Sequence, residues 1–199
     1  MGSRELILDR VRAALRDAPV VAEAPRDYRP AGTNKADLEV LIDRLVDYKA
    51  EVYRVSSGEV AATAARITGD GGAVLVPPGL PEEWRPEGAY VDDGLTPDRI
   101  ASAGAVLTAA AIAVAETGTI VLDASPDQGR RIITLLPDVH LCVLRPGQVV
   151  ASVPDAVARL DPRRPLTWIS GPSATSDIEL NRVEGVHGPR HLHVLILDT

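Results

Sequence analysis

The groups best suited to binding chemistry lie together in residues 170–190. A Ser-Gly-Pro-Ser-Ala-Thr run leads to Asp177, and His187 and Arg190 follow on a turn that contains glycine and proline. Arginine can hold a carboxylate through two parallel hydrogen bonds, and histidine exchanges protons near neutral pH. The pattern indicates a site for a small anion. The candidate ligand-binding residues are Ser170, Gly171, Ser173, Thr175, Asp177, His187, Gly188 and Arg190.

The same stretch also has a purely structural interpretation. Thr175 or Ser176 could cap a helix whose first turn contains Asp177 and Glu179, because hydroxyl side chains accept hydrogen bonds from the first free N–H groups of a helix. Arg190 could then pair with one of those two carboxylates. Both interpretations stay open on the sequence.

A second candidate segment is Glu-Thr-Gly-Thr at 116–119, where a predicted helix ends and a strand begins. The glycine supplies backbone freedom, and Glu116 is placed at the sheet edge. The structural alternative is a helix that ends at a glycine and carries a solvated glutamate.

Other polar residues have less specific patterns. One arginine of Gln-Gly-Arg-Arg at 128–131 could turn toward the same pocket, although an exposed, solvated pair is more common. His140, between apolar neighbours, is expected to be a buried or half-buried histidine with its hydrogen bonds satisfied. His191 and His193 share one face of a strand, but no cysteine or suitably spaced acid completes a metal site, so no metal is expected.

The elements that must position these residues are short apolar strands that alternate with helices. This alternation predicts an α/β fold with a mostly parallel sheet flanked by helices on both faces. Helices are expected at 59–67, 97–102, 109–115, 127–135 and 154–160, and another begins at an Asn34 cap. The expected strands are 52–55, 73–76, 90–91, 105–107, 119–122, 139–144, 149–153, 166–169 and 192–197.

The N-terminal residues form a separate unit in this prediction. Residues 4–16 have the spacing of an amphipathic helix, and residues 18–35 have no periodicity and contain several prolines. We therefore divide the chain into an N-terminal helix and linker, 1–35, and one domain, 36–199. The helix is expected to pack at a distance from the domain, for example on a neighbouring subunit.

Composition excludes several classes of partner and cofactor. The formal net charge of -7 opposes nucleic-acid binding. The only cysteine, Cys142, allows no internal disulfide and is too few for an iron–sulfur cluster, and no dinucleotide-binding glycine motif is found, so no cofactor is expected. The sequence shows no signal peptide and no apolar run long enough to cross a bilayer, which predicts a cytoplasmic protein without membrane insertion.

Three segments, in this order, carry a resemblance to a known family. They are Ala-Glu-Thr-Gly-Thr-Ile-Val at 115–121, Leu-Pro-Asp-Val-His at 136–140, and Ser-Gly-Pro-Ser-x-Thr-x-Asp-Ile-Glu at 170–179 followed by Gly-Val-His-Gly-Pro-Arg at 185–190. With them the chain resembles the lactate utilization protein C family, the stand-alone LUD-domain proteins. The resemblance implies a fold similar to that of the sugar-phosphate isomerase and coenzyme A transferase group.

The resemblance also implies roles. In related transferase folds a carboxylate near such a strand end acts as nucleophile or base, which makes Glu116 the candidate catalytic residue and Thr117, Gly118 and Thr119 candidate ligand contacts. Family members take part in L-lactate utilization beside partner proteins that carry the iron–sulfur motifs. The chain is thus expected to be a non-redox subunit that binds a small anionic ligand, for example a carboxylate.

Two other functions remain open at this point. One is a free-standing enzyme that acts on a folate, coenzyme A or phosphorylated substrate, with Glu116 as nucleophile or base. The other is a structural assembly module whose N-terminal helix and linker dock a partner.

Overall fold

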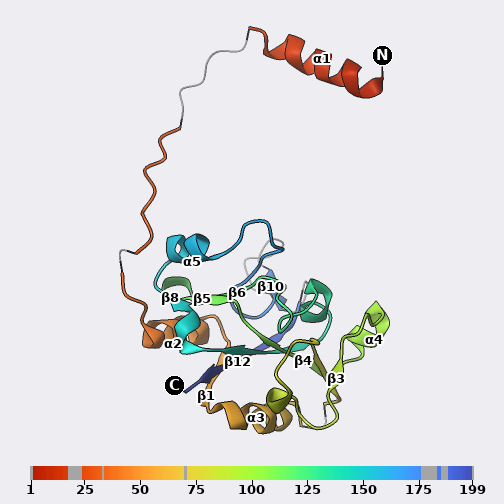
Figure 1. Cartoon of the computed structure of the whole chain (residues 1–199), viewed down its shortest axis with the longest axis vertical. Coiled ribbons are helices and arrows are strands. Elements are labelled where there is room, and N and C mark those ends of the chain that lie inside the picture. Colours follow the sequence, from red (N-terminus) through yellow and green to blue (C-terminus); the bar gives the residue numbers. More distant parts are fainter. Residues whose placement is uncertain are drawn as a thin grey trace.

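The structure is a computed structural model that describes residues 2–17, 24–32, 34–69, 71–175, 183–184 and 188–198, without the side chains of 174–175 and 183–184. Its N-terminal helix, α1 (Ser3–Leu15), buries none of its residues and stands clear of the rest of the protein, as Figure 1 shows. Residues 24–32 run from the side of α1 to the body without helix or strand.

A six-stranded sheet, sheet A, forms the centre of the body, and each neighbouring pair of its strands is parallel. This confirms the predicted α/β fold with a mostly parallel sheet. In spatial order the strands are β1 (Glu51–Val55), β12 (His191–Leu197), β7 (Val139–Leu144), β4 (Ala105–Ala109), β2 (Val74–Val76) and β3 (Tyr90–Val91).

A second, mixed sheet was not predicted. Sheet B has the order β8 (Val149–Val150), β5 (Ile112–Val114), β6 (Thr119–Leu122) and β9 (Thr167–Ile169), with antiparallel β5–β6 and β6–β9 pairs. A two-stranded sheet joins β10 (Ala174–Thr175) to β11 (Val183–Glu184).

The helix predicted over 109–115 was wrong. Residues 112–114 form β5, because Ile112 and Val114 pack into one apolar cluster while Ala113 packs into another on the opposite face. Such burial on both faces at a period of two requires a strand. The helix predicted over 127–135 was also wrong, since only η4 (Arg131–Thr134) is helical, as a 3-10 turn.

The remaining helices cover the two faces of sheet A. One face packs against sheet B and α2 (Leu38–Asp47), and the other packs against α3 (Val60–Thr68) and η2 (Glu82–Trp84). α2 is capped by Asp37, whose side chain accepts from two backbone N–H groups, and not by Asn34 as predicted. The other short helices are η1 (Ser57–Glu59), α4 (Pro97–Ala101), η3 (Ala115–Thr117), η5 (Pro146–Gln148) and α5 (Val153–Arg159).

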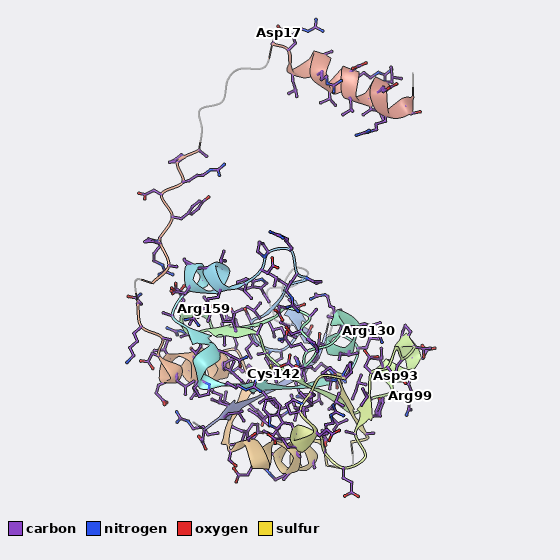
Figure 2. The ribbon with its side chains drawn as sticks, viewed as in Figure 1. Asp17, Asp93, Arg99, Arg130, Cys142 and Arg159 are labelled. Carbon is purple, nitrogen blue, oxygen red and sulfur yellow. The ribbon has the colours of Figure 1, made fainter. Side chains whose placement is uncertain are left out.

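One ion pair fixes η4 to the segment that follows β3. Arg130, labelled in Figure 2, donates from Nε to Asp92 Oδ2 at 2.7 Å and from Nη2 to Asp92 Oδ1 at 2.5 Å. The Asp92 side chain is buried and also accepts from the N–H groups of Gly94 and Leu95. The guanidinium keeps the pKa of Asp92 below its ordinary value, so this carboxylate stays charged inside the protein.

We predict that Arg130→Ala lowers the free energy of unfolding by about 1 to 3 kcal/mol, because a buried carboxylate loses its charged partner but keeps two backbone donors. Urea unfolding at pH 7 measures this. Arg12→Ala, on the exposed surface of α1, is the control and should change stability by less than about 0.5 kcal/mol. Equal effects of the two changes would contradict the structural role given to Arg130.

Candidate functional site

A cavity of about 220 Å³ lies where the tail loops meet the amino ends of β7 and β12. We call it the tail cavity. It lies between the two sheets and is bordered by η4, β9 and the turns at 170–173 and 188–189. The polar side chains in its lining are Arg131, Thr134, His140, Thr167, Ser170 and Ser173, and the motif glycines Gly171 and Gly188 line it as well.

The two turns are tied to each other by the Ser173 N–H, which donates to the Pro189 carbonyl at 2.8 Å. Ser170, Gly171, Ser173 and Gly188, all predicted as ligand contacts, therefore line one cavity although they belong to separate segments. Asp177 and His187 lie outside the described residues, as does the side chain of Thr175.

Arg131 is the only charged side chain among the described residues that line the tail cavity. Its Nη1 donates to Thr167 Oγ1 of β9 at 2.6 Å, which holds the guanidinium at the cavity wall. The other arginine of the pair, Arg130, turns away to Asp92. The two adjacent arginines therefore have different partners: Arg130 binds Asp92, and Arg131 can offer its positive charge to a ligand in the tail cavity.

His140 contributes an uncharged imidazole to the tail cavity. It is 1% exposed, and its Nε2 lies 2.8 Å from Thr108 Oγ1 of the neighbouring strand β4. Burial lowers the pKa of His140 to about 4, because a charged imidazole would be poorly solvated there. At neutral pH it can form hydrogen bonds without adding charge, and the prediction of a buried, hydrogen-bonded histidine agrees with this geometry.

A chain of hydroxyl groups connects the Glu-Thr-Gly-Thr segment to the cavity. Thr117 Oγ1 lies 2.8 Å from Thr119 Oγ1, which lies 2.9 Å from Ser170 Oγ. Thr119 is itself buried in β6, so it reaches the cavity through Ser170. Thr117 and Thr119 therefore support a residue of the cavity wall and do not line the cavity themselves.

The glycines of both motifs are required by the close approach of α2. Gly118 has a φ of 62°, and a Cβ there would lie 2.8 Å from the Arg44 Cβ. Gly171 has a φ of 80°, and its Cβ would lie 2.7 Å from the Tyr48 carbonyl oxygen. Both conformations favour glycine, and both positions leave no room for a side chain.

Glu116 lies apart from the tail cavity, in η3. Its Oε1 accepts from Arg29 Nη2 of the linker at 2.6 Å and from the N–H of Val153, the first residue of α5, at 3.1 Å. These donors, the arginine foremost, hold the pKa of Glu116 below its ordinary value, so the carboxylate is ionised. In this structure the Glu116 carboxylate is thus in contact with an arginine of the linker.

Arg190 is bound to a carboxylate of the protein. Its Nε and Nη2 donate to the two oxygens of Asp138 at 2.6 and 2.7 Å, a bidentate pair that lowers the pKa of Asp138. The sequence had suggested Asp177 or Glu179, both outside the described residues, as its partners. The observed pair joins the residue before β12 to the residue before β7.

Sequence reasoning missed Thr134 and Thr167, and it did not separate Arg131 from Arg130. Nothing in the local sequence marks the two threonines, because β9 and η4 meet only in the folded chain. The sequence did mark Asp138 as a candidate, because this residue stands directly before a predicted strand and inside a motif shared with the family.

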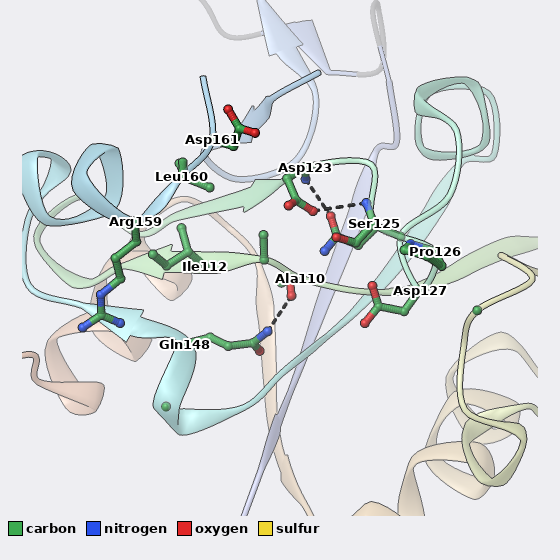
Figure 3. Close-up of a pocket in the computed structure, with 14 residues that line it drawn as sticks. Ala110, Ile112, Asp123, Ser125, Pro126, Asp127, Gln148, Arg159, Leu160 and Asp161 are labelled. Atoms are coloured by element: carbon green, nitrogen blue, oxygen red, sulfur yellow. Dashed lines mark hydrogen bonds between the residues drawn. The ribbon is translucent and has the colours of Figure 1, made fainter. Parts of the chain in front are cut away.

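A larger cavity of about 540 Å³ lies at the opposite edge of sheet A, beyond the carboxyl ends of β4 and β7. Figure 3 shows Asp123, Asp127 and Asp161 around it with a single arginine, Arg159. Burial raises the pKa of Asp127. The acidic wall of this larger cavity disfavours the binding of an anion. A carboxylate ligand therefore fits the tail cavity better.

Among the residues that the structure describes, no group of three or more His, Cys, Asp or Glu side chains is arranged to hold a metal ion. In the same residues, no helix has both the length and the apolar character that a membrane crossing requires.

The burial of His140 generates a pH prediction. The unfolded chain binds a proton on this residue below about pH 6.5, whereas the folded chain binds one only near pH 4. Stability is therefore lost as the pH falls through this window, and His140 should account for about 2 to 3 kcal/mol between pH 7 and pH 4.5. Urea unfolding at both pH values should show a weaker dependence in His140→Gln, with the exposed His191→Gln as control. Equal pH dependence in wild type and His140→Gln would contradict this assignment.

Comparison with known proteins agrees with this architecture. The chain is 46% identical over 176 residues to lactate utilization protein C of Deinococcus radiodurans, covering 84% of this chain and 83% of the relative. It is 27% identical to lactate utilization protein C of Bacillus velezensis, covering 87% and 84%. The crystal structure of a DUF162 family protein from Deinococcus radiodurans superposes with a TM-score of 0.69 at 39% identity, covering 81% of this chain and 96% of that one.

The family model of the LUD domain matches residues 38–197, which include every strand of both large sheets. The match begins at the first residue of α2 and leaves out α1 and the linker. The chain belongs to the LUD domain family.

Proposed function

We propose that this protein is a non-redox component of L-lactate utilization that binds a small carboxylate in the tail cavity. Relatives of similar length carry the name lactate utilization protein C, which supports the process. The observation that carries the binding proposal is Arg131, the one charged side chain in the described wall of a small, otherwise neutral cavity.

The size of the cavity supports a ligand of few atoms. Pockets for drug-sized ligands measure roughly 300 to 1,000 Å³, and the tail cavity measures about 220 Å³. A coenzyme A or folate molecule would exceed it, whereas lactate or pyruvate would not. Arg131 would hold the carboxylate, and the hydroxyls of Ser170 and Thr134 and the neutral His140 would contact the polar atoms at the second carbon.

The single cysteine supports a division of labour with other proteins. Cys142 is buried in β7 at the centre of the body (Figure 2), and burial raises the pKa of its thiol to about 12. A buried, protonated thiol is neither a metal ligand nor a redox centre. We therefore assign electron transfer from lactate to iron–sulfur partner proteins, with this chain as the subunit that binds the carboxylate.

Titration calorimetry with L-lactate and pyruvate tests the site. We expect binding of at least one acid by the wild type and a loss of roughly 10- to 100-fold in affinity in Arg131→Gln, because a charged hydrogen-bonded pair contributes about 1.5 to 3 kcal/mol. Arg159→Gln, in the larger cavity, is the matched control and should bind as the wild type does.

Three outcomes would contradict this proposal. They are no binding of either acid, a loss confined to Arg159→Gln, or turnover of a folate or coenzyme A substrate by the isolated chain that Glu116→Gln abolishes. The last would favour the free-standing enzyme.

The partner proposal has its own test. Gel filtration of the purified chain with purified cysteine-rich lactate utilization proteins should give a joint peak, and lactate should reduce the iron–sulfur centres only in that mixture. Reduction of the clusters by lactate at the same rate without this chain would show that it is not needed for the reaction.

A further inference from the structure

Helix α1 presents an apolar face that the protein itself does not cover. Ile7, Val11 and Leu15 follow at intervals of four, which places them on one side of the helix, and they are 60%, 49% and 62% exposed. An isolated helix of fewer than about 12 to 15 residues is marginal in water. α1 has 13 residues and buries none of them, so it needs a surface to pack against.

A second uncovered apolar face lies on α5. Val153 and Val157, also four residues apart, are 37% and 60% exposed. The inner side of α5, at Ala156, is buried against sheet B. The outer side of α5 therefore carries a short apolar strip from Val153 to Val157, about half as long as the α1 face from Ile7 to Leu15.

The linker is fixed where it passes α5. Arg29 pairs with Glu116, whose carboxylate also accepts from the first N–H of α5, and the Gly32 N–H donates to Asp155 Oδ1 of α5 at 2.5 Å. From these two contacts the chain leads away to α1 (Figure 1). Residues 16–28, if fully extended, span at most roughly 45 Å.

The net charges of the N-terminal arm, residues 1–35, and of the body, residues 36–199, have opposite signs. This favours contact between the arm of one copy and the body of another. Residues 1–35 contain seven basic and five acidic residues, whereas residues 36–199 contain fourteen basic and twenty-three acidic residues. The arm is thus positive and the body strongly negative. In a two-fold pair each molecule offers one arm and one acceptor face, so a second copy covers both exposed faces with a single type of contact.

We propose that α1 docks on the outer face of α5 of a second copy of this chain, so that two copies exchange their N-terminal arms. In this dimer the two linkers run antiparallel, and each α1 lies at the point where the other arm leaves its body. The apolar faces of α1 and α5 form the contact, and the Arg29 and Gly32 contacts hold each arm to its own domain.

Light scattering coupled to gel filtration tests the proposal on the full chain. We expect twice the mass of one chain for the wild type and the mass of one chain for Val11→Asp and for Val157→Asp. Leu6→Asp is the matched control, because Leu6 is 43% exposed on α1 but lies five residues from Val11 and so on another side of the helix. It should leave the dimer intact, and urea unfolding should show that all four bodies are folded.

A disulfide experiment identifies the two partners of the contact. One preparation carries Val11→Cys and another, with a different tag, carries Val157→Cys; the native Cys142 is buried. After mixing and oxidation, a disulfide between the two tagged chains is expected. A doubly substituted chain that forms only an internal disulfide, a link only between two Val11→Cys chains, or a wild type with the mass of one chain at all concentrations would overturn the proposal.

Discussion

The packing of sheet B onto sheet A is the interaction on which the rest of the structure depends. One apolar cluster takes Cys142, Val194 and Ile196 from sheet A, Ala113 and Ile120 from sheet B, and Leu41 from α2, all essentially inaccessible to water. Burial of such side chains contributes roughly 25 cal/mol per Å² of apolar surface. It also brings the tail segment, whose own sequence is polar, against the amino ends of β7 and β12.

The tail cavity exists because this packing stops before it reaches the edge of sheet A. Along the inner face of β7, Cys142 and Leu144 belong to the apolar cluster, but His140, on the same side of the strand, is polar. The equivalent position on β12 is Leu192, so the cavity has an apolar wall beside its polar one. The opposite edge of the sheet has an acidic opening, so the two ends of the same strands differ in the charge they can accept.

The sequence predicted much of the fold and less of the site. The strands of sheet A were predicted because continuous runs such as 139–144 are buried on both sides, and helices such as 97–102 have clear caps. Sheet B was missed because β5 and β8 are short and rich in alanine and valine, and their pairing depends on residues far away in the chain. For the same reason Arg131 could not be separated from Arg130, since Thr167 and Asp92 decide where each side chain points.

The contact between Arg29 and Glu116 has a consequence for any molecule that would approach this glutamate. The two residues are 87 positions apart in the chain, but Gly32 is held on Asp155 only three residues after Arg29. A tether this short keeps the guanidinium near the carboxylate at a local concentration in the millimolar range. A free cation of equal intrinsic affinity would need a comparable concentration to displace the guanidinium from Glu116.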